Sequence, residues 1–118
     1  MKYTIPGELP GLNEVLDRAK GHWSQYAKLK RDYTLLCSAC ARKLSPIEGA
    51  VAVEIQWHCK NKKRDPDNIA SAKKFILDGL IIAGVLPNDG WAQIAKLTDT
   101  FRVARSNPRI EVTLTKHT

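Results

Sequence analysis

The chain has 118 residues, of which 43% are hydrophobic and 26% are charged, which is the composition of an ordinary globular protein. This length suits one domain with a single core, so we expect one domain over residues 1–118. No apolar run approaches the length of a membrane span, and the N-terminal residues lack the apolar core of a signal peptide. The sequence therefore predicts a cytoplasmic protein with no membrane partner.

The charge balance is strongly basic, with a formal net charge of +7 and a pI near 9.5. Lysine and arginine side chains that neutralise phosphates release counterions, so a polyanion is the expected partner. No basic amphipathic helix with an aromatic face is evident, which makes an anionic membrane surface the least favoured choice. Charge alone does not separate DNA from RNA.

Hydrophobic periodicity and chain-breaking residues divide the sequence into elements in the order β-α-α-β-α-β-β. The expected elements are a strand at residues 2–5, helices at 13–20 and 24–44, a strand at 51–59, a helix at 66–83, and strands at 93–105 and 109–115. This order predicts an α+β fold, with a mixed β-sheet and helices packed on it.

The second helix carries a basic face opposite its apolar stripe. That face holds Lys28, Lys30, Arg31, Arg42 and Lys43. A solvated surface and a nucleic-acid contact explain this face equally well.

The strand that follows, VAVEIQWHC, alternates between apolar and other residues. We expect Val51, Val53, Ile55 and Trp57 to face the core. His58 then lies on the outer face of the sheet, where a structural position is favoured over a metal-ligand role. In the strand after the third helix, Ala95, Leu97, Phe101 and Val103 are expected on one side.

The three cysteines do not form an even set for a disulfide framework. Cys37 and Cys40 have the spacing of a zinc or redox motif, with Cys59 as a further candidate ligand. They also lie at helical spacing, where free cysteine acts as a small buried hydrophobe. The second interpretation is favoured.

The segment from Lys60 to Trp91 concentrates acids beside a basic run, which reads KNKKRDPDN. A purely structural interpretation exists, in which Asp65 caps a helix, Pro66 is its first residue and Asp67 suits the positive end of the helix dipole. Gly84 would end that helix, and a turn at residues 87–90 would follow.

Helix geometry favours a chemical role for the same segment. At roughly 100° per residue, a continuous α-helix would place Asp67, Ser71, Lys74 and Asp78 in nearly one row along its surface. Lys73 would point away from this row. Asp89, in the following turn, could reach this row only if the next strand lies beside residues 51–59. Carboxylates that hold Mg²⁺ or Mn²⁺, a lysine that stabilises anionic charge and surrounding cations are the groups that phosphodiester hydrolysis needs.

The motifs KRDPDN, AKKFILDGL and AGVLPNDGWAQI resemble the RusA family of Holliday junction resolvases, endodeoxyribonucleases that are common in prophages. The likeness is specific over residues 62–94. It is weaker near the N-terminus, where the segment from Pro10 to Tyr33 is similar to the family's basic and aromatic entry segment.

The resemblance implies roles for individual residues. The residues that it marks as catalytic are Asp65, Asp67, Lys74 and Asp89, and the three aspartates among them are implied to hold Mg²⁺. Lys62, Lys63, Arg64, Lys28 and Lys30 are implied to bind DNA. Asp78 has a secondary role, and Lys73 is the competing choice for the catalytic lysine. Asn88 departs from the family, where a second aspartate commonly precedes the last one, and the helix before Asp78 is longer than in short members.

The family also implies a homodimer, because two symmetric nicks in a four-way junction require two active sites related by a two-fold axis. No small-molecule cofactor is implied. Two other hypotheses stay open on the residues alone. One is a branched-DNA-binding module that does not cut, and the other is a metal nuclease that acts on other branched nucleic acid, including RNA.

Overall fold

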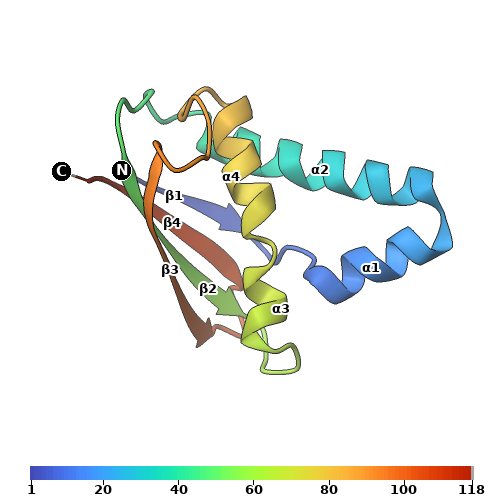
Figure 1. The fold of residues 1–118 in the computed structure, drawn as a ribbon. Helices are drawn as coiled ribbons and strands as arrows, with labels where there is room; N and C mark the ends of the chain where they lie inside the picture. The colour runs from blue at the N-terminus through green and yellow to red at the C-terminus, as the bar shows by residue number, and fades with distance from the viewer. Residues whose placement is uncertain (118) are drawn as a thin grey trace.

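The computed structural model describes residues 1–117 as an α+β fold, a mixed sheet with helices on one face (Figure 1). The elements are β1 (Lys2–Pro6), α1 (Leu12–Gly21), α2 (Trp23–Ala41), β2 (Val51–Cys59), α3 (Pro66–Ala70), α4 (Lys73–Ile82), β3 (Ile94–Val103) and β4 (Arg109–Lys116). The predicted fold class and element order are confirmed. Within residues 1–117, no helix is both long and apolar enough to span a bilayer.

The sheet has the strand order β1-β4-β2-β3. β4 pairs antiparallel with both β1 and β2, whereas β3 runs parallel to β2. The α3–α4 segment is the connection between these two parallel strands. Because Val51 pairs with Ile94, the turn that leads into β3 returns beside the start of β2. We expected Asp89 to reach the polar row of the helix only if these two strands were neighbours. Their neighbouring position is therefore confirmed.

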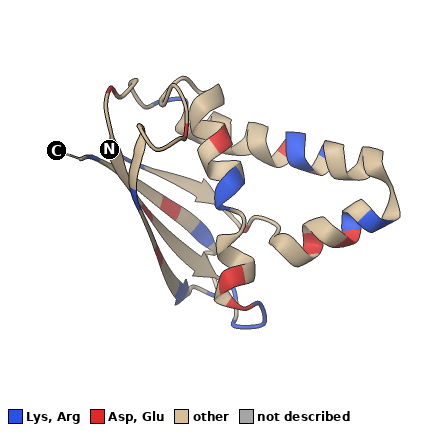
Figure 2. Cartoon of the chain, in the orientation of Figure 1, with Lys and Arg blue, Asp and Glu red and all other residues tan. Residues whose placement is uncertain are grey.

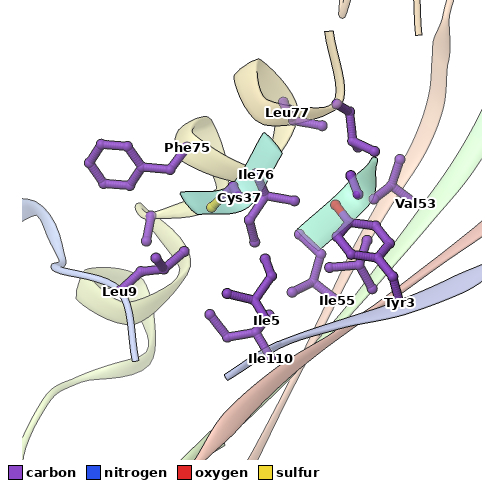
Figure 3. Packing of buried hydrophobic residues seen from close by; sticks show 14 of the residues in the cluster. Tyr3, Ile5, Leu9, Cys37, Val53, Ile55, Phe75, Ile76, Leu77 and Ile110 are labelled. Atoms are coloured by element: carbon purple, nitrogen blue, oxygen red, sulfur yellow. The ribbon is translucent and has the colours of Figure 1, made fainter. Parts of the chain in front are cut away.

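The core lies between the sheet and the two helices α2 and α4 (Figure 3). In β2 the predicted inward residues Val51, Val53, Ile55 and Trp57 are at most 2% exposed. Tyr3 and Ile5 of β1 meet this layer from the other edge of the sheet. The alternation predicted for β2 is confirmed as far as Trp57, whereas His58, which was expected to point to the outside, is only 9% exposed.

The strand β3 departs from this pattern. Its residues Leu97, Phe101 and Val103 are in register with inward-facing residues of β2, yet their side chains remain 39–43% exposed. β3 forms one edge of the sheet, and no strand of residues 1–117 pairs with its outer side. This strand therefore presents both apolar side chains and unpaired backbone groups to the outside.

The third predicted helix is divided into α3 and α4 at Ser71 and Ala72. At the division the Ala72 N–H donates to Ile69 O at 3.2 Å. This bond spans three residues, as in a 3₁₀-helix, instead of the four that an α-helical bond spans. The Ser71 hydroxyl donates to Asn68 O at 2.6 Å and accepts from the Leu12 N–H at 2.7 Å. Since the helix is interrupted there, the straight row that was expected to join Asp67 to Lys74 does not cross this turn.

Candidate active site

Asp65 and Asp67 stand at the start of α3, where the basic loop ends. Asp65 occupies the N-cap with Pro66 directly after it, but the Asp65 side chain makes no capping hydrogen bond. Both residues are exposed, and the Asp67 carboxylate accepts a hydrogen bond from the neighbouring Asn68 N–H at 2.9 Å. The carboxylate of Asp65 is therefore not used to cap the helix, which removes the main structural explanation for that residue.

A hollow of about 430 Å³ lies beside these two carboxylates. Its walls include Asp17 and Glu14 of α1, together with Lys63. Burial alone would raise the pKa of the Glu14 carboxyl group. This effect is outweighed by hydrogen bonds from the Glu14 backbone N–H and the Asn68 amide and by the charge of Arg64, so the pKa is lowered. Glu14 is thus an ionised member of this acidic hollow.

The basic loop is held to the protein by Arg64. Its guanidinium donates to Leu9 O at 2.9 Å and to Glu14 Oε1 at 3.4 Å, and it lies 3.7 Å from Glu8 Oε2. Lys62 and Lys63 are exposed instead. Figure 2 shows the resulting arrangement, a basic loop directly next to the acidic start of α3. The two lysines are available to phosphates, whereas Arg64 anchors the loop.

The start of α1 docks on α3, an arrangement that the sequence did not predict. The Asn68 side-chain oxygen accepts from the Asn13 N–H at 2.9 Å, and Gly11 is the N-cap residue of α1. A Cβ atom at Gly11 would lie 2.4 Å from Asn68 O, so only glycine permits this approach. Nothing in the local sequence around Gly11 indicated that this segment would contact α3.

Lys74 lies between two carboxylates on the outer face of α4. Its Nζ is 3.0 Å from Asp78 Oδ1 and 3.1 Å from Asp89 Oδ2. Hydrogen bonds to Asp78 and then to Asp89 raise the pKa of Lys74 above its ordinary value, against the opposing effect of burial. Lys74 is therefore a fixed cation whose side chain is still 62% exposed.

Lys73 points away from Lys74, as the helical geometry predicted. Its Nζ donates to Asp99 Oδ2 of β3 at 2.6 Å, and the Trp57 indole donates to the other Asp99 oxygen at 2.9 Å. Both members of the Lys73–Asp99 pair are about four-fifths covered. Lys73 therefore serves the packing of α4 against the sheet. Asp99 had no role assigned from sequence, because its contacts depend on the register of β3.

The sequence matches the family model Endodeoxyribonuclease RusA over residues 12–115. The chain belongs to the RusA family. RusA proteins are endodeoxyribonucleases that resolve Holliday junctions, so this chain is a hydrolase that acts on branched DNA. A comparison with curated proteins found no significant match.

RusA nucleases generally depend on a divalent metal, so the aspartates of this site are considered as ligands for such an ion. Asp65 and Asp67 offer hard carboxylate oxygens in an exposed acidic hollow, and Mg²⁺ accepts one or two protein carboxylates with retained waters. Asp89, however, is held by Lys74. Among residues 1–117, no three His, Cys, Asp or Glu side chains are gathered closely enough to share a metal ion. The two aspartates of α3 fit the ion, and Asp89 is not brought to them.

Asn88 directly precedes Asp89 in the turn after α4. Its side-chain oxygen accepts from the Asp89 N–H at 2.9 Å. This bond shapes the turn and so supports the position from which Asp89 reaches Lys74.

The remaining implied DNA-binding residues lie on α2. Lys28 and Lys30 are both exposed. Lys30 borders a small hollow that Lys74 also borders, which places this part of α2 next to the candidate catalytic lysine.

Cys37 is buried at the contact between α2 and α4. A Cβ atom at Gly79 would lie 2.7 Å from Cys37 Cβ, so a small pair of residues allows the two helices to approach closely. Burial, with a smaller contribution from Cys40, raises the pKa of Cys37 to about 12. The thiol is therefore protonated and packs as a small apolar group.

Proposed function

We propose that this RusA-family protein resolves four-way DNA junctions by Mg²⁺-dependent hydrolysis of paired, symmetric phosphodiester bonds, with Asp65, Asp67, Lys74 and Asp89 at its active site. The observation that carries the proposal is the exposed pair of carboxylates, Asp65 and Asp67, placed beside the exposed lysines of the basic loop. A protein that only bound phosphates would gain nothing from acids at this position, because they repel the backbone.

Asp65 and Asp67 would hold the metal, which when bound supplies positive charge at the scissile phosphate and activates the attacking water. Asp89 is the proposed third ligand. Since Asp89 is bonded to Lys74 in the free protein, its recruitment would require the turn after α4 to rearrange.

The other groups would act on the DNA directly or by positioning another side chain. Lys74 is a cation at neutral pH, and hydrogen bonds to Asp78 and Asp89 raise its pKa further in the free protein, so it can stabilise negative charge that develops on the phosphate or on the departing oxygen. Asp78 would orient Lys74 through their 3.0 Å contact. Lys62, Lys63, Lys28 and Lys30 would hold phosphates without reading sequence, and Arg64 would support them by anchoring the loop.

A homodimer completes the proposal, and the edge of β3 supports it. This edge strand runs from Ile94 to Val103 with Leu97, Phe101 and Val103 exposed. A long apolar edge is an open template for pairing unless another element covers it. A second copy that covers both edges around a two-fold axis would give the two related sites that symmetric nicking needs.

The cleavage test compares a synthetic four-way junction with a linear duplex of the same arm sequence, in Mg²⁺, Mn²⁺ or EDTA. We expect paired nicks at symmetric positions in two opposing strands, only on the junction and only with a divalent metal. Tight binding without nicks in either metal would contradict the hydrolytic role. Equal cutting of a structured RNA in competition would contradict the assignment of DNA junctions as the substrate.

The dimer test measures the molar mass of the protein in solution by light scattering. Phe101→Glu places a charge on the β3 edge and is expected to shift the protein towards monomer. Leu16→Glu is the matched control, because Leu16 of α1 is 48% exposed and lies outside β3. A wild-type monomer at all concentrations, or a dimer unaffected by Phe101→Glu, would exclude this interface.

A further inference from the structure

A third hollow, of about 550 Å³, lies between α2 and α4. It is lined by Trp23, Tyr26, Leu35 and Ile82 as well as the cations Lys30 and Arg31, and we call it the α2–α4 groove. Its lining residues come from α2 and α4, the two helices that cross in Figure 1.

The apolar side chains of the groove are unusually open to solvent. Trp23 is 78% exposed, Ile82 is 56% exposed and Leu35 is 50% exposed. Large apolar side chains that gather open to solvent around a hollow are typical of a surface that binds a partner. Tyr26, which is half-buried, adds a second aromatic ring beside Trp23. The hollow is large enough for a flat aromatic ring system.

The rim of the groove is basic. Lys30 and Arg31 are both exposed. Asp78 also lines the groove but pairs with Lys74 at 3.0 Å, whereas Asp32 lies 3.7 Å from Arg31 in a solvent-exposed pair. Such an exposed pair neutralises little. Aromatic rings with cations beside them match a nucleotide, whose base is flat and apolar on its faces and whose phosphate is anionic.

The groove is also continuous with the candidate active site. Asp78 lines the groove and holds Lys74 at 3.0 Å. Lys30 and Tyr26 line both the groove and the smaller hollow that Lys74 borders. A DNA strand whose phosphate lies at Lys74 would therefore pass Lys30 before it reaches Trp23.

We propose that the α2–α4 groove binds an unstacked nucleobase of a DNA strand that passes the active site, with Trp23 and Tyr26 stacking on the base and Lys30 and Arg31 holding the adjacent phosphates. The inference rests on the proposed position of the strand at Lys74. Unstacking a base costs less free energy where the duplex is interrupted than within an intact duplex, so such a subsite would favour branched DNA.

The test compares binding of a labelled oligothymidine with that of an abasic oligonucleotide of the same length, both in EDTA so that no strand is cut. The two probes share their phosphates and differ only in their bases. Stacking on an aromatic side chain corresponds to a preference of about 5- to 150-fold for the base-bearing probe. We expect the wild-type protein to show it, and Trp23→Ala to lose most of it while keeping its affinity for the abasic probe.

Trp91→Ala is the matched control, since Trp91 is 99% exposed but does not line the groove. We expect this variant to keep the base preference. Trp23→Phe retains an aromatic face and should keep part of the preference, which covers the case in which Trp23→Ala folds poorly. Lys30→Gln should weaken the binding of both probes to the same extent. It should also lower the slope of log affinity against log salt by roughly 0.7.

Three results would overturn the inference. These are equal wild-type affinities for the two probes, a base preference that survives both substitutions of Trp23, and a preference that Trp91→Ala removes equally. A Trp23→Ala variant that changes from dimer to monomer and keeps the base preference would assign the groove to a second copy of the chain. If the wild-type protein prefers the base-bearing probe but never nicks a junction, the proposed function fails and this inference stands.

Discussion

Lys74 and Asp89 are 15 residues apart in the sequence, and a 3.1 Å hydrogen bond joins their side chains. This bond ties α4 to the turn that leads into β3. The adjacent Lys73 takes the opposite direction and bonds to Asp99 at 2.6 Å. Two neighbouring lysines therefore have separate tasks, one at the proposed active site and one in the packing of the helix on the sheet.

Substitution of Lys74 by Gln should impair cutting far more than folding. Loss of a group that stabilises transition-state charge typically slows an enzyme about 100- to 1000-fold. The free energy of unfolding should change by less than about 1 kcal/mol, because the Lys74 side chain is 62% exposed. Single-turnover nicking of a junction and urea denaturation measure the two effects.

Substitution of Lys73 by Gln is the matched comparison and should show the reverse. It leaves Asp99, only 20% exposed, with the Trp57 indole as its remaining partner. We expect a loss of about 1–3 kcal/mol in the free energy of unfolding. Lys73→Gln that unfolds like wild type but no longer cuts would show that the catalytic lysine has been misassigned.

Arg64 and Lys62 should differ in the same way within the basic loop. Arg64→Gln removes bonds to Leu9 and Glu14 and should cost about 1–2 kcal/mol of stability. Lys62→Gln should leave stability unchanged and lower the slope of log junction affinity against log salt by roughly 0.9. Thermal denaturation and fluorescence anisotropy in EDTA, at several salt concentrations, test both. A larger change in salt slope for Arg64→Gln than for Lys62→Gln would contradict the anchoring role.

The elements with strong local patterns were predictable from sequence. In β2 the alternation of Val51, Val53 and Ile55 was enough to place the strand and its buried face. The separation of Lys73 from Lys74 followed from helical geometry, and both lysines have the partners that this geometry allows.

Features that depend on long-range packing were not predictable. The break at Ser71 follows from contacts with Leu12, which lies 59 residues earlier. The exposure of Phe101 follows from the position of β3 at the sheet edge. Asp99 gained a role only because the parallel register places it beside Ile55 and within reach of Lys73.

His58 should make the stability of the protein depend on pH. Burial, followed by the charge of Arg109, lowers the pKa of His58 below its ordinary value of 6.5, although Glu111 opposes this effect. The unfolded chain then binds the proton more readily than the folded chain, so stability should fall as pH decreases from about 7 to about 5.

The variant His58→Gln should flatten this part of the profile. Glu111 does not confuse the measurement, because a hydrogen bond from Arg109 lowers the Glu111 pKa and its contribution is lost only below the ordinary value of 4.5. Urea denaturation across this pH range provides the comparison. Identical pH slopes for wild type and His58→Gln would show that another group is responsible.

The most direct test of the proposed active site compares Asp67→Asn with Asp17→Asn on a four-way junction in Mg²⁺. Both residues are exposed and both border the same acidic hollow, but only Asp67 is a proposed metal ligand. We predict that Asp67→Asn abolishes nicking while it keeps or tightens junction binding, since one negative charge beside the phosphates is lost. Asp17→Asn should cut at the wild-type rate. Undiminished cutting by Asp67→Asn would contradict the metal site on which the account depends.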